Sequence, residues 1–121
     1  MAEVGVEGLI TFLYYKDLAK AMHFYEEIMG FQLSIDQGWS KIYRITDGAY
    51  LGLVDERCGY HRASARKPVI VCFVVPDVDA WYRFLKEKGV DTLTEPKDSE
   101  ELKIRAFMLQ DPEGYVIEIQ T

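Results

Sequence analysis

The sequence predicts an α+β domain built from two βαβββ modules that follow one another along the chain. Each half opens with a run of β-branched and aromatic residues, continues with a helical apolar pattern that ends at a glycine, and closes with three extended runs. The chain has 121 residues, a length typical of one domain. We therefore expect a single domain over residues 1–121, with module one at about 8–56, a linker at 57–67 and module two at about 68–121.

The first module begins with a predicted strand over residues 9–15. Asp17 can cap the following helix, because its carboxylate can accept a hydrogen bond from an unpaired backbone N–H group of the first turn. The helix is expected to end at Gly30, since glycine adopts the left-handed conformation common at helix C-termini. Its predicted apolar face consists of Leu18, Ala21, Met22 and Tyr25. Three further strands are expected at 31–35, 41–45 and 50–54, with a hairpin turn at Asp47-Gly48.

The second module repeats this order. A strand is predicted over 69–75, and Asp77 is the expected helix cap, with Asp79 as the alternative. The helix should end at Gly89. Its predicted apolar face consists of Val78, Trp81, Tyr82 and Leu85, with Trp81 in the core. Strands should follow at 90–93, 102–109 and 115–120, the last two joined by the turn Asp111-Pro112-Glu113-Gly114.

Charge and cysteine content narrow the classes of function. The formal net charge is −6, whereas a general nucleic-acid-binding protein needs a basic surface to neutralise phosphates. Acidity also disfavours adsorption to an anionic membrane, and no apolar run approaches the roughly 20 residues of a membrane span. The start, Met1-Ala2-Glu3, lacks the basic and apolar stretches of a signal peptide. Cys58 and Cys72 form no CxxC pair, so we expect a protein of the reducing cytoplasm. From the net charge and the absence of a long apolar run, we expect neither a nucleic-acid nor a membrane partner.

Two motifs lie near the ends of the chain. One is Tyr15-Lys16-Asp17-Leu18 followed by Phe24-Tyr25-Glu26-Glu27-Ile28-Met29-Gly30-Phe31, and the other is Asp111-Pro112-Glu113-Gly114-Tyr115-Val116-Ile117-Glu118-Ile119. With the paired modules, they resemble the glyoxalase/bleomycin-resistance/dioxygenase superfamily, also called vicinal oxygen chelate, over about residues 8–121. The resemblance implies curled antiparallel or mixed four-stranded sheets around a U-shaped ligand cleft. It does not fix a function, because the scaffold hosts lyases, dioxygenases, thiol transferases and drug-binding proteins.

The resemblance also implies four metal-ligand positions. They fall at Ile10, Gly52, Ile70 and Glu118, and only Glu118 has a side chain that can bind a metal. A single carboxylate does not make a tight site, because catalytic zinc sites use about three protein ligands. We therefore expect no metal site of the family's usual kind and no cofactor. The alternative is an atypical divalent-metal site that contains Glu118 and His61.

The same resemblance, combined with strand alternation, predicts which side chains line the cleft. The predicted cleft residues are Phe12, Tyr14, Trp39, Arg44, Tyr50, Gly52, Met108 and Glu118. Apolar walls with a few orienting polar groups are typical of a small-molecule site. Gly52 is expected to leave space where a side chain would otherwise lie. A sheet interior filled by its own side chains is the alternative.

Several of these residues have more than one interpretation. Glu118 could be a structural remnant paired with Arg44 or a tyrosine, a ligand-recognition group, or a catalytic general base. Trp39 could be a rim that stacks on a flat ligand or an ordinary loop tryptophan. Cys72 is expected to be a small buried hydrophobic residue. A basic cluster in the linker could capture an anion or be a solvated connector; it consists of Arg57, His61, Arg62, Arg66 and Lys67.

These observations favour a metal-independent protein that binds a small, partly aromatic molecule. One alternative is a glyoxalase-like lyase, isomerase or dioxygenase with an atypical metal site. The other is a non-catalytic interaction module. We also expect a homodimer, because two small modules expose sheet edges that pairing between chains would cover.

Overall fold

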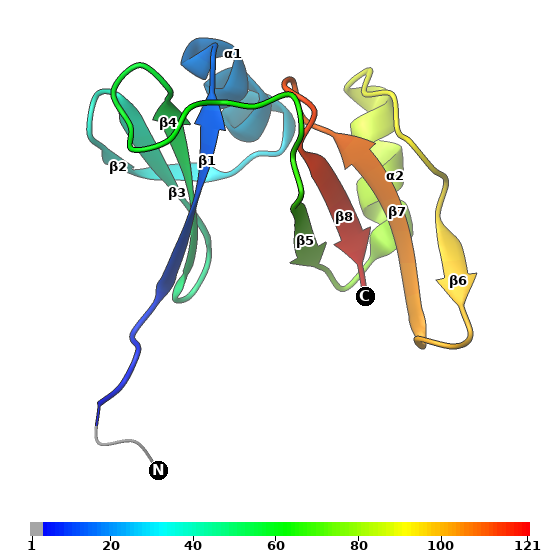
Figure 1. Cartoon of the computed structure of the whole chain (residues 1–121). Helices are drawn as coiled ribbons and strands as arrows, with labels where there is room; N and C mark the ends of the chain where they lie inside the picture. Colours follow the sequence, from blue (N-terminus) through cyan, green and yellow to red (C-terminus); the bar gives the residue numbers. More distant parts are fainter. Residues whose placement is uncertain (1–3) are drawn as a thin grey trace. The chain divides into compact units, whose positions relative to one another are not determined.

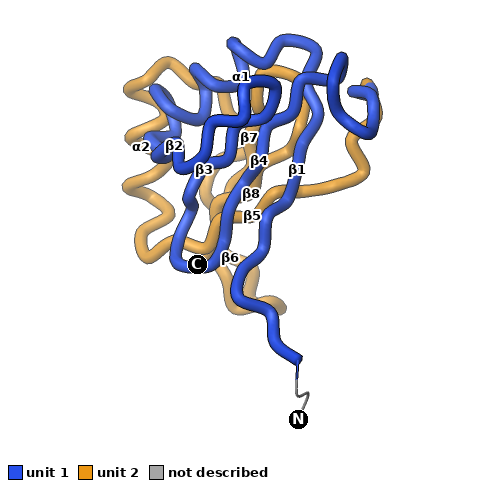
Figure 2. The backbone as a smooth tube through the Cα atoms, turned by 90° about the vertical axis from the view of Figure 1, so that its left-hand side faces the viewer, with its two compact units in different colours: residues 1–64 blue, residues 65–121 orange. Residues whose placement is uncertain are grey.

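The computed structural model describes residues 4–121. Its internal contacts divide the chain into two compact units, with the boundary between Ser64 and Ala65 (Figure 2). Met1, Ala2 and Glu3, on which the expectation of no signal peptide rested, lie outside the described residues. In the described part of the chain, no helix is long and apolar enough to cross a membrane.

The first unit is a four-stranded mixed sheet with helix on one face (Figure 1). Its elements are β1 (Leu9–Tyr15), α1 (Leu18–His23), η1 (Phe24–Ile28), β2 (Gln32–Asp36), β3 (Ser40–Thr46) and β4 (Ala49–Asp55). The strand order is β1-β4-β3-β2, with β1 parallel to β4 and the other pairs antiparallel. The predicted strands are thus present, with bounds that differ by one residue or less.

The first helix departs from the predicted regular α-helix. As predicted, the Asp17 carboxylate caps it and accepts a hydrogen bond from the backbone N–H of Lys20. The helix then changes to a π-helix, η1, in which the N–H of Met29 donates to the carbonyl of Phe24. Phe24 and Tyr25 are buried in this segment, whereas Met22 from the predicted apolar face is only half-buried.

Alternation along β1 separates the two faces of the first sheet, as predicted. Leu13 and Tyr15 are buried on the side that α1 and η1 cover, while Ile10 and Phe12 are more than 40% exposed on the other side. We call this second side, which no helix of the first unit covers, the open face. It is the face on which the site described below is built.

The second unit has the same topology. Its elements are β5 (Ile70–Val74), α2 (Val78–Glu87), β6 (Lys97–Ser99), β7 (Ile104–Gln110) and β8 (Val116–Gln120), in the sheet order β5-β8-β7-β6. The carboxylate of Asp77 caps α2. The carboxylate of Asp111 accepts hydrogen bonds from the N–H groups of Glu113 and Tyr115 and so forms the predicted turn. Two four-stranded mixed sheets, each with its helix, confirm the predicted fold class.

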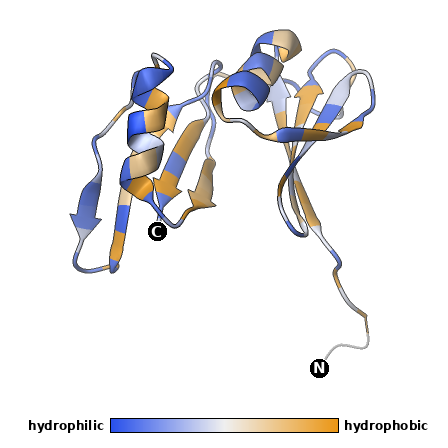
Figure 3. Cartoon of the chain, turned by 180° about the vertical axis from the view of Figure 1, so that it is seen from behind, coloured by the Kyte–Doolittle hydropathy of each residue, from blue (hydrophilic) through white to orange (hydrophobic). Residues whose placement is uncertain are grey.

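The prediction of a strand at 90–93 was wrong. This segment contributes one isolated bridge, between Thr92 and Leu109, and the fourth strand is β6. Figure 3 shows β6 as hydrophilic and β5 as hydrophobic along its length. The β6 strand pairs with β7 through backbone hydrogen bonds and is largely exposed, so its sequence carries no apolar alternation.

The core of the second unit also differs from prediction in one position. Val78 and Leu85 of α2 are buried, but Trp81 is half-buried and contacts Phe84 edge-to-face. Arg105 of β7 makes a two-pronged ion pair with Asp79, the alternative cap residue. Asp79 therefore ties α2 to the sheet rather than capping the helix.

Candidate functional site

The open face of the first sheet carries two adjacent rows of side chains. Strand register aligns Tyr14, Val54 and Ser40 across β1, β4 and β3, and residues in register point to the same face. The neighbouring row consists of Phe12, Gly52 and Ile42. The first row, together with Phe12 from the second, forms the floor of a pocket near the carboxyl ends of β1 and β4.

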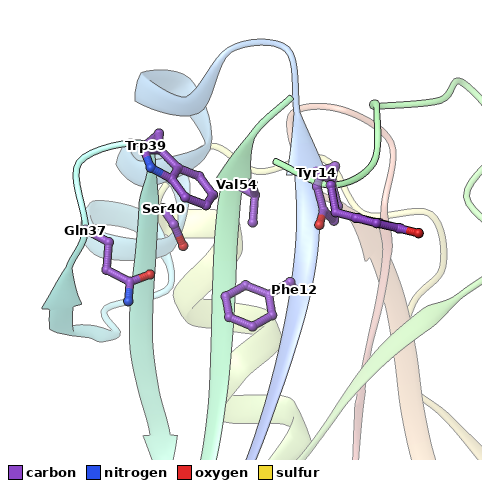
Figure 4. Close-up of a pocket in the computed structure, with 7 residues that line it drawn as sticks. Phe12, Tyr14, Gln37, Trp39, Ser40 and Val54 are labelled. Atoms are coloured by element: carbon purple, nitrogen blue, oxygen red, sulfur yellow. The ribbon is translucent and has the colours of Figure 1, made fainter. Parts of the chain in front are cut away.

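The pocket has a volume of about 190 Å³. Its lining residues are Phe12, Tyr14, Gln37, Trp39, Ser40, Val54 and Tyr60, and none of them carries a charge (Figure 4). A dry cavity of roughly 150 Å³ holds one benzene ring, so this volume suits one small aromatic ring. Four of the lining side chains are themselves aromatic. The site therefore has the apolar walls and sparse polar groups of a small-molecule pocket.

A tight turn between β2 and β3 places Trp39 at the rim. The carboxylate of Asp36 accepts hydrogen bonds from the N–H of Gly38 and from Nζ of Lys41, at 2.8 and 2.6 Å. Gly38 has a φ of +79°, which glycine adopts without steric cost. The Lys41 ammonium, with the Gly38 N–H second, lowers the pKa of the Asp36 carboxyl. The Asp36 carboxylate thus holds the turn through these hydrogen bonds and is not one of the residues that line the pocket.

A second turn, after β4, supplies the opposite wall. The backbone carbonyl of Asp55 accepts hydrogen bonds from the N–H groups of Cys58 and Gly59. A Cβ atom on Gly59 would lie 2.5 Å from a methyl carbon of Val54 and 2.6 Å from the Tyr14 ring, so only glycine fits there. This close approach brings Tyr60 to the pocket, although its side chain is 90% exposed. His61 follows, with its ring centroid 5.4 Å from that of Tyr14.

Asp55 stabilises this second turn through Arg57. The guanidinium Nη2 lies 2.6 Å from one carboxylate oxygen of Asp55, and the Arg57 backbone N–H donates to the other. These bonds, the side-chain bond first, lower the pKa of the Asp55 carboxyl to about 2. Arg57 is therefore engaged within its own turn, and Lys67, in the second unit, lies 4.7 Å from the Tyr115 ring. These contacts favour a connector over an anion-capturing cluster.

Replacing Asp55 by asparagine is expected to lower the free energy of unfolding at neutral pH. Because the folded pKa lies below the ordinary value of 3.8, the carboxylate contributes stability above about pH 4 that is lost as the pH falls toward 2. Urea unfolding between pH 7 and pH 2.5 should therefore show a flatter acid loss in Asp55→Asn than in the wild type. Asp47→Asn is the control, since that carboxylate is 98% exposed and pairs with Arg44 on the surface. Equal acid slopes in wild type and Asp55→Asn would contradict the assignment.

Ser40 is the polar group that stands out in the pocket. The residue is 1% exposed, and its hydroxyl oxygen has no hydrogen-bond partner within residues 4–121. An unsatisfied buried hydroxyl costs about 1–3 kcal/mol, so most folded proteins avoid one. In Figure 4 the side chain projects from β3 beside Trp39, on the side where Val54 lies. The pocket thus contains an unused hydrogen-bonding group.

The structure brings together three of the eight predicted cleft residues: Phe12, Tyr14 and Trp39. Arg44 and Tyr50 are register partners farther along the same sheet, and Arg44 forms an ion pair with Asp47 of its own hairpin. The expected space at Gly52 is absent. The Phe12 ring covers this glycine so closely that a Cβ atom would lie 2.6 Å from Cε1 of the ring.

Sequence reasoning missed four lining residues: Gln37, Ser40, Val54 and Tyr60. Val54 and Ser40 follow from alternation if the strands are extended by two residues from Gly52 and Ile42. Gln37 and Tyr60 lie in turns, where no periodic signal exists. Only the turn hydrogen bonds place them at the site.

The remaining predicted residues belong to the second unit. Met108, Glu118 and Cys72 are aligned across β7, β8 and β5 on the face of that sheet opposite α2. The prediction that Cys72 is buried was wrong, because it lies on this exposed face. Partial burial, then the negative charge of Glu118 and a hydrogen bond to it, raise the pKa of the Cys72 thiol. The thiol is therefore protonated at neutral pH, which disfavours a nucleophilic role.

The residues at the family's metal positions do not fit a divalent metal. Ile10 and Ile70 present hydrocarbon side chains, and the Phe12 ring occupies the space beside Gly52. Glu118 supplies one carboxylate, which the Cys72 thiol already contacts. Among residues 4–121, no three His, Cys, Asp or Glu side chains are grouped so that they could hold a metal ion. We therefore derive no chemistry through a metal.

Comparison with known proteins agrees with this fold. The family model described as the Glyoxalase/Bleomycin resistance protein/Dioxygenase superfamily matches residues 9–119. The chain belongs to this superfamily. A curated relative, the uncharacterized protein YraH of Bacillus subtilis (strain 168), is 29% identical over 113 residues, which cover 85% of this chain and 88% of YraH.

Two solved structures illustrate how widely this superfamily fold is used. Lactoylglutathione lyase from Agrobacterium tumefaciens has a TM-score of 0.75 at 20% identity, covering 93% of this chain and 90% of the lyase. TioX from Micromonospora sp. ML1 has a TM-score of 0.78 at 20% identity, covering 93% of this chain and 96% of TioX. At this level of identity the likeness shows the fold alone. The function must be argued from the site.

Proposed function

We propose that this superfamily member binds a small aromatic molecule, without a metal, in the pocket of its first unit. One observation carries the proposal. Four aromatic side chains, from β1 and from the turns after β2 and β4, surround one cavity that has no charged lining residue. Aromatic rings attract one another in stacked or edge-to-face arrangements beyond the gain from buried area.

The exposure of aromatic side chains at the pocket rim favours ligand binding over a sheet face that is filled by its own side chains. Phe12 is 43% exposed and Trp39 is 47% exposed, although both lie at the pocket. A sheet that fills its own interior would bury such rings more completely. A ligand ring would cover this surface, and the strands beneath it would hold the walls in place.

The two tryptophans allow a direct test by NMR. Trp39 lines the pocket, whereas Trp81 lies on α2 of the second unit, so the ¹H–¹⁵N spectrum should contain one indole N–H signal for each. Titration with phenol should shift the Trp39 signal saturably and leave the Trp81 signal unchanged, both before and after dialysis against EDTA. Trp39→Phe assigns the two signals.

Trp39→Ala should weaken phenol binding about tenfold, measured by calorimetry, because it removes one ring of the rim. Tyr50→Ala is the matched control, since Tyr50 lies on the same sheet but outside the pocket. Absence of a saturable Trp39 shift with phenol, indole and 2-naphthol would overturn the proposal. Binding that disappears with EDTA would overturn its metal independence and favour the enzymatic alternative.

A further inference from the structure

The pocket contains a buried hydrogen-bonding group that a purely apolar ligand would leave without a partner. The Ser40 hydroxyl is buried and has no hydrogen-bond partner in the described chain. Nearby backbone groups are already engaged: the Ser40 carbonyl accepts from the N–H of Gln37, and the Trp39 carbonyl accepts from the N–H of Asp55. A ligand atom that donates to or accepts from this hydroxyl would therefore meet a group with full hydrogen-bonding capacity.

Charge around the pocket is neutralised locally. In the two turns beside the pocket, Asp36 pairs with Lys41 and Asp55 pairs with Arg57. Each of these four charges therefore already has a partner of opposite sign. The lining itself is uncharged, and its polar groups besides Ser40 are the Gln37 amide and the hydroxyls of Tyr14 and Tyr60. Transfer of a charged ligand into such a site would cost solvation energy without a countercharge.

We infer that Ser40 determines specificity by hydrogen-bonding to a polar substituent on an uncharged aromatic ring, so the ligand class is phenol-like. This inference rests on the proposed function. The ring would lie among Phe12, Trp39 and Tyr60, and its hydroxyl would reach Ser40 at the base of the pocket. Sites built to hydrogen-bond a substrate hydroxyl reject analogues that lack it, because their buried polar group then stays unpaired.

Phenol and toluene form a matched pair of probes, since a methyl group replaces the hydroxyl at similar size. The wild type should bind phenol about tenfold more tightly than toluene. In Ser40→Ala this ratio should fall to within about twofold, with toluene affinity unchanged or improved. Ser34→Ala, an exposed serine of β2 outside the pocket, should retain the wild-type ratio.

Charged probes test the second half of the inference. Phenyltrimethylammonium and benzoate should both bind more weakly than phenol to the wild type. Tighter binding of the ammonium would indicate a cation-binding aromatic cage and overturn the uncharged class.

The outcomes separate the inference from the proposed function. If phenol and toluene bind equally to the wild type, or if Ser40→Ala keeps the preference, the role of Ser40 is wrong while the aromatic pocket stands. If neither probe shifts the Trp39 signal, the proposed function itself fails. A higher melting temperature of ligand-free Ser40→Ala, by a few degrees, is expected from removal of the unpaired hydroxyl and checks that the variant folds.

Discussion

Gly52→Ala is expected to destabilise the first unit by about 1–3 kcal/mol and to weaken phenol binding at least tenfold. The new methyl group would lie 2.6 Å from Cε1 of Phe12 and closer still to Cδ1, so the two groups cannot coexist. Phe12 is partly exposed, and its ring is the group that can move. Because this ring also lines the pocket, relief of the clash removes part of the pocket wall.

A double-mutant cycle isolates this contact. Phe12→Ala removes the ring, so adding Gly52→Ala to that variant should cost little stability, and the coupling energy should approach the cost of Gly52→Ala alone. Urea unfolding of the four proteins measures it. Gly5→Ala is the control for replacing a glycine, because a Cβ atom at that position would meet nothing within 4 Å. Additive effects of the two substitutions would show that Phe12 does not determine the choice of glycine.

Periodicity predicted those parts of the fold that depend on burial of alternate residues. In β1, Leu13 and Tyr15 are buried while Phe12 is exposed, as a half-buried strand requires. The same reasoning placed Glu118 and Met108 on one face of the second sheet. Side-chain periodicity therefore predicts which face of the sheet each residue occupies in strands such as β1, β7 and β8.

Elements whose partners are backbone groups gave no such signal. The β6 strand is held by pairing with β7, and a sequence of Lys, Asp and Ser cannot reveal a strand by apolar alternation. The π-helix is similar, because what defines it is a backbone hydrogen bond from the N–H of Met29 to the carbonyl of Phe24, five residues earlier. Local propensity does not encode that change of register.

The site was predictable only in part for the same reason. Phe12 and Tyr14 followed from alternation on one strand, but Tyr60 reaches the pocket through a turn that Asp55 and Gly59 build. The role of Gly52 was also misread, because a glycine in a strand can mark an empty space or a close approach by a neighbouring side chain. The register of β1 on β4, which places Phe12 opposite Gly52, decides between them.

Tyr43→Phe is expected to lower the free energy of unfolding by about 1.5–3 kcal/mol. Tyr43 is fully buried on the helix-covered side of β3, and its hydroxyl donates to the Glu26 carboxylate of η1 at 2.8 Å. The substitution keeps the ring and removes this side-chain hydrogen bond between the strand and the π-helix. Tyr60→Phe, at a 90% exposed position, should change stability by less than about 0.5 kcal/mol.

The pH dependence of the free energy of unfolding provides a second test of the contact between Tyr43 and Glu26. Burial, and then the hydrogen bond to Glu26, raise the pKa of the Tyr43 phenol above its ordinary value of 10. The phenol therefore contributes stability that is complete below about pH 10 and is lost as the pH rises through its folded pKa. Urea unfolding from pH 7 to pH 11 should show an alkaline loss in the wild type that is smaller in Tyr43→Phe. A variant as stable as the wild type at pH 7, with the same alkaline slope, would mean that packing alone holds η1 against the sheet.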